Sequence, residues 1–291
     1  MALRLEHVSY TYSADTPWAV TAINDVSFAV EQGEVVGIVG HTGSGKSSLA
    51  QLICGLIPAD SGQIWLNDLQ IVGVKKLKAV ELVKRVGMVF QYPEHQLFEE
   101  TVAAEISYGP TNLGWSPEQV KQGVFDIADM LGMPAEFLSR NPLQLSGGEK
   151  RKVTLASVLV MNPKILVLDE PFVGLDSVAR QDFIATLLAW QKEHQATILC
   201  ISHDMDQLAA FCQRLLVMQG GRLILDAPIQ QAFAEQEILA KAGILLPVAK
   251  QLLLALQQHG WQLNVLPLTP AEAVQEIMAY CRREAGDDDG H

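Results

Sequence analysis

Apolar runs bounded by turn residues recur along the chain and predict strands. Leu3 to Tyr12 and Ala22 to Val30 are two such runs joined by a turn, and the β-branched run Glu34 to Val39 lies between Gly33 and Gly40. The third run therefore reads as a buried strand that leads into a glycine loop. More strands are expected further on, at Val86 to Phe90, Ile165 to Leu168, Thr197 to Ile201, Leu215 to Met218 and Arg222 to Asp226.

Helical spacing takes over between these runs. From Lys46 onward the apolar residues recur at a helical period that stops before Pro58. Alternating strands and helices imply a mostly parallel core sheet, so the predicted fold class is α/β with an antiparallel β part at the N-terminus. Between Gln91 and Met161 the strand pattern disappears and helical patterns such as Pro117 to Leu131 dominate. We therefore expect a helical insertion at about residues 92–161.

The chain beyond residue 235 is mainly helical by the same criterion. Helical spacing covers Pro228 to Gln258 and Glu272 to Arg283, and an acidic tail follows. We therefore predict a first domain at 1–235 and a small C-terminal helical domain at 236–291. Its apolar residues pack either on its own core or on a partner, and contact across a dimer is the favoured interpretation. These residues are Ile238, Leu239, Ile244, Leu245, Leu246, Val248, Leu252, Leu253 and Leu256.

Composition narrows the class of protein. With 49% apolar and 19% charged residues the chain is expected to fold, but its mean hydropathy of +0.17 raises the question of a membrane. The densest apolar run, Gly243 to Leu256, is interrupted by Pro247 and Lys250 and is shorter than the roughly 20 residues of a spanning helix. We therefore expect the chain not to cross a bilayer by itself.

Net charge and cysteine spacing argue against nucleic-acid binding, zinc binding and disulfide-stabilised folds. The net charge of -12 offers no general attraction to nucleic acid, so any bound phosphate must meet local donors. The four cysteines are far apart and form no CxxC pair, which argues against a zinc site and against a disulfide framework. Together with the lack of a cleavable apolar segment at the N-terminus, this pattern favours a reducing cytoplasm.

A phosphate-binding loop follows the third predicted strand. Residues 40–47 match the pattern of a glycine, four residues and then Gly-Lys-Ser. The glycines let backbone N–H groups surround the phosphates, Lys46 reaches the β- and γ-phosphates, and the Ser47 hydroxyl ligates magnesium. Contacts with the nucleotide are expected from Gly40, His41, Thr42, Gly43, Ser44, Gly45, Lys46, Ser47 and Ser48.

Two carboxylates follow the strand at Ile165 to Leu168. Asp169 lies at the carboxyl end of this strand, where a phosphate-loop protein needs a ligand for magnesium. Glu170 lies one residue beyond, where a general base for an attacking water would be placed. An Asp-Glu pair alone is usually a solvated strand end, but its occurrence with the phosphate loop favours the catalytic interpretation.

A second glycine motif precedes another expected helix, Lys152 to Met161. In Leu145-Ser146-Gly147-Gly148-Glu149, the serine suits a helix N-cap and the glycines leave backbone N–H groups uncovered for an anion. Taken alone, this motif favours the interpretation as a capped helix start over an anion site.

The order of these motifs resembles that of the nucleotide-binding subunit of an ATP-binding cassette (ABC) transporter. The resemblance covers about residues 1 to 235, and Leu145 to Glu149 is similar to the family signature LSGGQ, with Glu149 where Gln is commoner. It implies that Tyr12 stacks on adenine, the alternative being a tyrosine on a strand face. It also implies that Gln91 senses magnesium and the γ-phosphate, that Asp176 belongs to a loop reaching the partner, and that His203 contacts the γ-phosphate.

The resemblance further implies a magnesium-dependent ATPase that is active as a dimer. Two subunits of this family enclose two ATP molecules head to tail, so Ser146, Gly147, Gly148 and Glu149 would face the ATP of the partner. The expected cofactors are ATP and Mg2+, with the metal held by Ser47, Gln91 and Asp169. Glu170, His203 and Gln91 are the expected catalytic residues.

The segment after Gln91 resembles one subfamily of these ATPases more specifically than the general family pattern does. Tyr92-Pro-Glu-His-Gln-Leu-Phe98 resembles ATPases of energy-coupling factor (ECF) transporters, which import vitamins and transition-metal ions, and is similar to the second of their two paralogues. The implied partners are a paralogous ATPase rather than a second copy, a transmembrane coupling subunit and a substrate-binding membrane subunit. The chain would then lie on the cytoplasmic face of the cell membrane as a peripheral subunit. Gln96, Leu97, Phe98, Glu99 and Glu100 would receive the coupling subunit, or would only pack the helical insertion.

Two other functions remain as alternatives. An ATPase of a binding-protein-dependent ABC importer would differ only in its partners. A soluble ABC ATPase acting on DNA or ribosomes usually has two cassettes or a long coiled-coil insertion, and this chain has neither.

Overall fold

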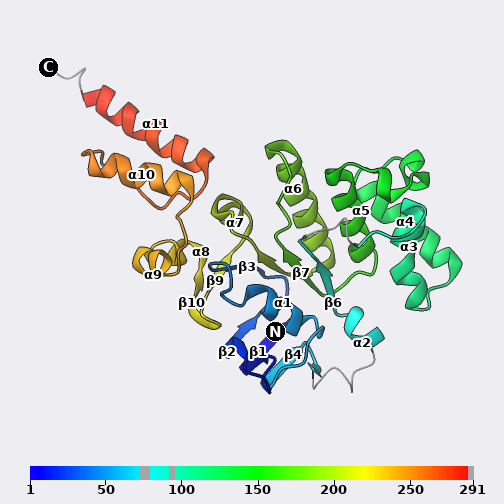
Figure 1. Cartoon of the computed structure of the whole chain (residues 1–291). Helices are drawn as coiled ribbons and strands as arrows, with labels where there is room; N and C mark the ends of the chain where they lie inside the picture. The colour runs from blue at the N-terminus through cyan, green and yellow to red at the C-terminus, as the bar shows by residue number, and fades with distance from the viewer. Residues whose placement is uncertain (72–78, 92–95, 288–291) are drawn as a thin grey trace.

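The molecule is built on two β-sheets with helices on the outside of the larger one. The computed structural model describes residues 1–71, 79–91 and 96–287. Figure 1 shows the helical insertion at one end of the core sheet and the last two helices projecting from the opposite end. The predicted α/β class, with its antiparallel N-terminal part, helical insertion and helical C-terminal part, is confirmed.

Within the described residues, the core sheet has six strands in the order β10-β9-β3-β8-β7-β6. Neighbouring strands from β9 to β6 pair in parallel, and β10 pairs antiparallel with β9. The central strands are buried along their whole length because helices cover one face and the second sheet the other. The bounds are β3 Val35–Val39, β6 Val86–Val89, β7 Ile165–Asp169, β8 Thr197–Ile201, β9 Arg214–Gln219 and β10 Arg222–Pro228.

The second sheet is antiparallel and has the order β2-β1-β4-β5. It contains β1 Leu3–Tyr12, β2 Val20–Val30, β4 Ser61–Leu66 and β5 Leu69–Ile71. The sequence pattern does not predict β4 and β5. They form a short hairpin whose turn contains Asn67 at φ 54, a left-handed conformation that asparagine tolerates.

The helices follow the strands in the expected alternation. Capping explains several of their starts: Ser116 and Gln119 form a capping box, as do Ser146 and Glu149, and Asp176 and Asp204 cap α6 and α7. The α-helices are α1 Lys46–Ile53, α2 Ala79–Val83, α3 Val102–Asn112, α4 Pro117–Met130, α5 Gly147–Leu159, α6 Ser177–His194, α7 Met205–Phe211, α8 Ile229–Ala232, α9 Gln236–Lys241, α10 Val248–Gln258 and α11 Pro270–Asp287. Two 3-10 helices, η2 Ala135–Ser139 and η3 Pro142–Gln144, connect α4 to α5.

The hydrophobic core has two layers, one on each face of the core sheet. Alternate residues of one strand enter different layers: Val36 and Ile38 pack with α1 and the second sheet, whereas Val35 and Val39 pack on the helical side. The helical layer continues into α9 through Leu239. The core sheet is therefore fixed on both faces, and the ends of its strands are held in place.

Helices α10 and α11 form a hairpin with a small cluster of their own (Figure 1). Ala249, Leu253, Leu263 and Ala273 are buried in it, and Trp261 stacks on Tyr280 with ring centroids 4.8 Å apart. Of the apolar residues singled out in the sequence, Leu239, Ile244 and Leu253 are buried. Others stay exposed on or near the hairpin: Leu245, Val248 and Leu252, together with Leu266, Val274 and Met278.

Within the described ranges, no helix has both the length and the apolar character that crossing a membrane requires. The four cysteines are free thiols. Cys54, Cys200 and Cys212 are buried, and burial raises the pKa of each thiol, that of Cys54 to about 12. Cys281, on α11, is exposed.

Candidate functional site

The phosphate loop lies between β3 and α1, with α1 beginning at Lys46. Gly43 and Gly45 have φ values of 81 and 104, which other residues rarely adopt. A Cβ on Gly45 would lie 2.4 Å from the carbonyl oxygen of Ala22, and one on Gly40 would lie 2.3 Å from that of Met218. The loop can therefore pass this close to neighbouring strands only with glycine at these positions.

Lys46 lies across the loop. Its Nζ donates hydrogen bonds to the carbonyl oxygens of Gly40 at 2.7 Å and His41 at 3.0 Å. Partial burial lowers the pKa of Lys46, and the carboxylates of Glu170 and Asp169 oppose this effect. The ammonium group is thus held over the place where the loop's N–H groups would meet phosphates.

The two predicted carboxylates lie at the carboxyl end of β7, beside the loop. Asp169 is 8% exposed and accepts a hydrogen bond from the Ser47 side chain. Burial, and then the neighbouring Glu170, raise the pKa of Asp169 despite this bond and the charge of Lys46. A buried carboxylate with a raised pKa gains from a nearby cation, since the positive charge offsets part of the cost of its desolvation.

Glu170 turns toward the end of β8. Its φ is 51, a strained value for a residue with a side chain, and its N–H bonds to the carbonyl of Ile201 at 2.8 Å. Oε2 of Glu170 lies 2.9 Å from Nδ1 of His203 and 3.4 Å from Oγ of Ser202. The structure therefore brings Glu170, the predicted base, into contact with His203, the residue predicted to contact the γ-phosphate, although the two residues are 33 positions apart in the sequence.

One cavity of about 410 Å³ unites most of the predicted nucleotide site. Tyr12 lies at its edge, where its hydroxyl is 3.2 Å from Oγ of Ser48 and 3.3 Å from Oε1 of Gln51. Tyr10 packs edge-on against the Tyr12 ring. The predicted residues that line the cavity are Tyr12, Thr42, Gly43, Gly45, Lys46, Ser47, Ser48, Gln91, Asp169 and Glu170.

The signature motif lies apart from this cavity, at the exposed start of α5. Ser146 Oγ and N–H both bind Oε2 of Glu149, at 2.7 and 2.8 Å. Hydrogen bonds from Ser146, and then one from Arg140, lower the pKa of Glu149 to about 2. Among the described residues that line the cavity, none comes from 146–149.

The structure adds residues that the sequence motifs did not reveal, because each acts through a tertiary contact. Arg151 of α5 is buried and donates from Nη1 to the carbonyl oxygens of Pro171, at 2.8 Å, and Val173. Arg180 of α6 donates to Asp204 at 2.8 Å and to the carbonyl of Leu175 at 2.9 Å. Asp176 is the N-cap of α6. The bonds of Arg151 and Arg180 connect the loop around Asp176 to the signature helix and to the segment after His203.

The predicted coupling segment divides into buried and exposed parts. Leu97 is buried in the helical core layer, whereas Phe98 is 60% exposed and packs edge-on against Tyr108 of α3. The N–H groups of Phe98 and Glu99 both bind Oε2 of Glu105, a buried residue of α3, at 2.9 Å. Of the predicted coupling residues, Gln96 is partly exposed and Glu100 exposed, and the preceding residues Tyr92 to His95 lie outside the described part of the chain.

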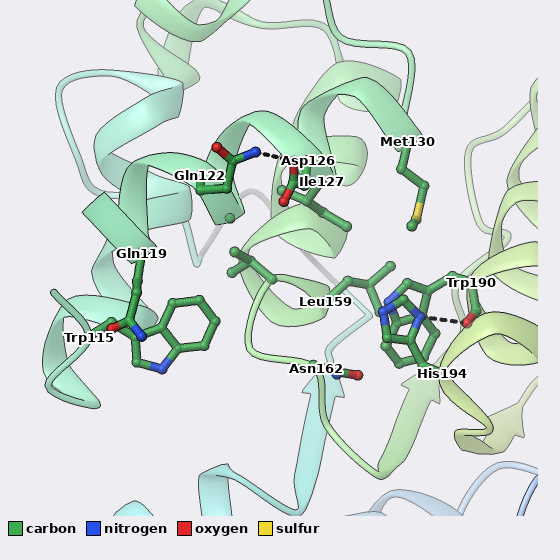
Figure 2. A pocket seen from close by; sticks show the side chains of 12 residues that line it. Trp115, Gln119, Gln122, Asp126, Ile127, Met130, Leu159, Asn162, Trp190 and His194 are labelled. Carbon is green, nitrogen blue, oxygen red and sulfur yellow. Dashed lines mark hydrogen bonds between the residues drawn. The ribbon is translucent and has the colours of Figure 1, made fainter. Parts of the chain in front are cut away.

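A second cavity, of about 420 Å³, lies between α4, α5 and α6 (Figure 2). Figure 2 shows the stacked rings of Trp190 and His194 on one side and Trp115 on the other. The described residues that line it include none of the predicted site residues. The chemistry therefore belongs to the cavity at the ends of β3 and β7.

Comparisons with known proteins agree with this geometry. The family model described as ABC transporter matches residues 23–173. The chain therefore belongs to the ATP-binding cassette family, and it is an ATP-binding and ATP-hydrolysing protein. Within that family it is an ATPase of the energy-coupling factor type, as its similarity over nearly the whole chain to curated members shows.

Two such relatives carry the description energy-coupling factor transporter ATP-binding protein EcfA2. The protein from Caldanaerobacter subterraneus subsp. tengcongensis is 39% identical, with 97% of this chain and 98% of the relative covered. The protein from Clostridium perfringens is 38% identical, with 97% and 99% covered.

Solved structures of cassettes are also similar. CbiO1 from Clostridium perfringens, described as part of the ABC transporter complex cbiONQ, has a TM-score of 0.72 and 33% identity, with 82% of this chain and 93% of that chain covered. The dimeric ABC transporter cassette MJ0796 has a TM-score of 0.69 and 25% identity, with 78% and 98% covered.

Proposed function

We propose that this chain powers the uptake of a vitamin or a transition-metal ion as one of two ATPases on a transmembrane coupling subunit. A paralogous ATPase is its partner rather than a second copy, and a separate membrane subunit binds the substrate. The chain lies on the cytoplasmic face of the membrane. The observation that carries the proposal is the separation of the nucleotide cavity from the exposed signature, because the signature then needs a second chain to act on.

The residues of the cavity divide the work of hydrolysis. The N–H groups of the phosphate loop and Lys46 bind the phosphates, and Tyr12 supports the adenine ring. Glu170 takes the proton of the attacking water, and His203, in contact with Glu170, orients that carboxylate toward the γ-phosphate. Positioning and charge stabilisation account for most of the catalysis of phosphoryl transfer.

Magnesium fits the oxygen atoms present in the cavity. Ser47 and Asp169 are already in hydrogen-bond contact, and Gln91 lines the same cavity, so their oxygens would hold the ion. When bound, magnesium neutralises charge on the β- and γ-phosphates. The burial of Asp169, which raises its pKa, supports this assignment, because a nearby cation would offset part of the cost of desolvating the carboxylate.

Closure of the dimer supplies the remaining contacts. Ser146, Gly147, Gly148 and Glu149 of each chain would face the ATP of the other, and Asp176 would reach across the same interface. We place the boundary between the ATPase domain and the C-terminal domain at residue 235. The exposed apolar residues of the α10–α11 hairpin support a role in dimer contact.

Phe98 is the residue on which the proposed membrane contact is best tested. It is exposed, held by Tyr108, and its backbone is fixed by Glu105, so it presents a rigid apolar anchor. Phe98→Ala should lower recovery of the membrane subunits in a detergent pull-down by about tenfold while leaving ATP affinity unchanged. Phe125→Ala, which removes another exposed ring of the insertion, is the matched control. Equal recovery with normal uptake would contradict the coupling role of this segment.

The identity of the copurifying subunits tests the function itself. Mass spectrometry of the complex purified in detergent should find a second ATPase and two kinds of membrane subunit, with no periplasmic-type binding protein. A binding protein would instead identify an importer of the other kind, and copurifying nucleic acid or ribosomes would identify a soluble ABC ATPase.

A further inference from the structure

Arg140 belongs to none of the sequence motifs, but its side chain contacts Glu149 of the signature. Its Nη1 lies 2.7 Å from Oε1 of Glu149, whose other oxygen accepts both hydrogen bonds from Ser146. One carboxylate thus connects an arginine from outside the motif to the serine of the signature. The two charged side chains are partly exposed, at 45% and 34%, so they lie at the surface that the signature presents.

The position of Arg140 is fixed from three sides. Its guanidinium lies over the buried ring of Phe137, 5.1 Å from the centroid. Its N–H bonds to the carbonyl of Phe137 at 3.1 Å, and its own carbonyl accepts from the N–H of Val102 at 3.0 Å, at the start of α3. The side chain is therefore held beside Glu149 by the packing of the helical insertion, and its position does not depend on the ion pair alone.

The charge of Glu149 creates a need for this arginine. At this position a glutamine would carry no charge, whereas the Glu149 carboxylate stays ionised because the hydrogen bonds of Ser146 and Arg140 stabilise it. In the proposed dimer this carboxylate approaches a triphosphate, and two like charges in a site from which water is partly excluded repel each other. A cation bonded to the carboxylate offsets that repulsion.

We infer that Arg140 is a positioning residue of the partner's ATP site: it holds the Glu149 carboxylate against Ser146 and cancels its charge where the signature meets the γ-phosphate. The inference rests on the proposed head-to-tail dimer and deepens it. It assigns a role to a residue that touches the signature and, through its backbone, the start of α3, immediately after the proposed coupling segment.

A charge-compensation cycle tests this inference in the assembled transporter. Arg140→Ala should raise the KM for ATP about fivefold with a smaller change in kcat, because an uncompensated negative charge then faces the triphosphate. Glu149→Gln alone gives the reference KM of the cycle, because it removes the charge that Arg140 offsets. The double variant should return to the KM of Glu149→Gln, since the arginine is not needed once the charge is gone. Arg140→Lys, which keeps the positive charge, should retain most of the affinity.

Two controls separate this role from general damage. Arg85→Ala removes another arginine with an acidic partner, Asp68, at the opposite end of β6 from Gln91, and should leave KM unchanged. If the double variant stays as impaired as Arg140→Ala, the arginine acts by supporting the fold and the inference is overturned. If Arg140→Ala is normal while Gly148→Ala loses activity, the inference is overturned and the proposed dimer stands. If neither variant changes activity, the proposed dimer itself fails.

Discussion

Two glycines of the phosphate loop, Gly40 and Gly45, differ from the two glycines of the signature in what surrounds them. Gly40 and Gly45 lie so close to carbonyl oxygens of neighbouring strands that a Cβ at either position would clash with them. A Cβ on Gly147 or Gly148 would meet nothing within 4 Å. The first pair is required by the chain's own packing, whereas nothing in the described part of the chain requires glycine at the second pair. In the proposed dimer, one half of the ATP site would thus be built by the core, and the other would be a surface that meets the partner.

Glu170→Gln should have the largest effect on the first half. Loss of a general base is expected to lower kcat in the assembled complex by about 1000-fold. ATP binding should persist because Lys46 and the loop are unchanged. Phosphate release and equilibrium binding of ATP, measured on the same preparation, check both parts. A near-normal rate would show that Glu170 is not the base.

Lys46→Ala should act mainly by weakening nucleotide binding, whereas Glu170→Gln should act mainly by slowing turnover. Loss of a charged donor to the phosphates is expected to raise the Kd for ATP roughly 10- to 100-fold. Titration calorimetry on the separate chain measures it, with Lys84→Ala as a control for loss of one positive charge. Unchanged affinity would contradict the role of the phosphate loop.

Alanine at Gly45 and at Gly148 should separate the two halves directly. Alanine at position 45 would place a Cβ against the carbonyl oxygen of Ala22 and would have to adopt a φ of 104. The free energy of unfolding should therefore fall by about 2 kcal/mol, and the affinity for ATP should fall as well. Gly148→Ala should leave stability unchanged or raise it by up to about 1 kcal/mol, since alanine favours the helix. Its ATPase rate in the complex should still fall about tenfold, because the new methyl meets the partner's nucleotide. Thermal unfolding and ATPase assays decide, and a destabilised Gly148→Ala chain would contradict the comparison.

The smallest expected effect is a difference in how acid acts on the two halves. The folded-state pKa of Glu149 is lowered to about 2, so its stabilising effect is complete above its ordinary pKa of 4.5 and is lost as pH falls toward 2. Asp169 has a raised pKa, so its ionised form costs stability at neutral pH and less in acid. Without nucleotide, Glu149→Gln should destabilise and Asp169→Asn should stabilise at pH 7, each by at most about 1 kcal/mol. Solvent screens the exposed Glu149, whereas the hydrogen bond from Ser47 and the charge of Lys46 offset part of the desolvation of Asp169.

Both differences should shrink as the pH is lowered. Melting temperatures of the two variants and the unchanged chain, followed from neutral to acidic pH, measure this. An Asp169→Asn difference that grows in acid would contradict the assigned direction of its pKa shift.

Sequence patterns predicted the parts of this molecule that depend on neighbours along the chain. The run Glu34 to Val39, the glycine loop and the helix after Lys46 were all placed correctly because periodicity and turn residues are local signals. The hairpin of β4 and β5 was missed since only Ile64 and Leu66 of β4 are buried, which is too few for a clear alternation.

Tertiary contacts explain the residues of the site that the patterns missed. Glu105, Arg140 and Arg151 belong to no motif, and each acts on a segment that the fold brings to it. Glu105 lies only six residues from Glu99, yet its role depends on burial that helical spacing does not indicate. By contrast, Glu170 and His203 follow two neighbouring parallel strands, so adjacency at one sheet edge could be inferred from the strand order.

The distribution of the cysteines leaves one thiol of the native chain, Cys281, accessible for labelling. Three thiols are closed off inside the cassette, and the fourth, Cys281, faces solvent on α11. A maleimide fluorophore should attach there without any engineered substitution. A probe at this position sits on the hairpin that projects from the cassette, where it can follow subunit assembly and exchange in real time in a transporter whose nucleotide site has been left untouched (Figure 1).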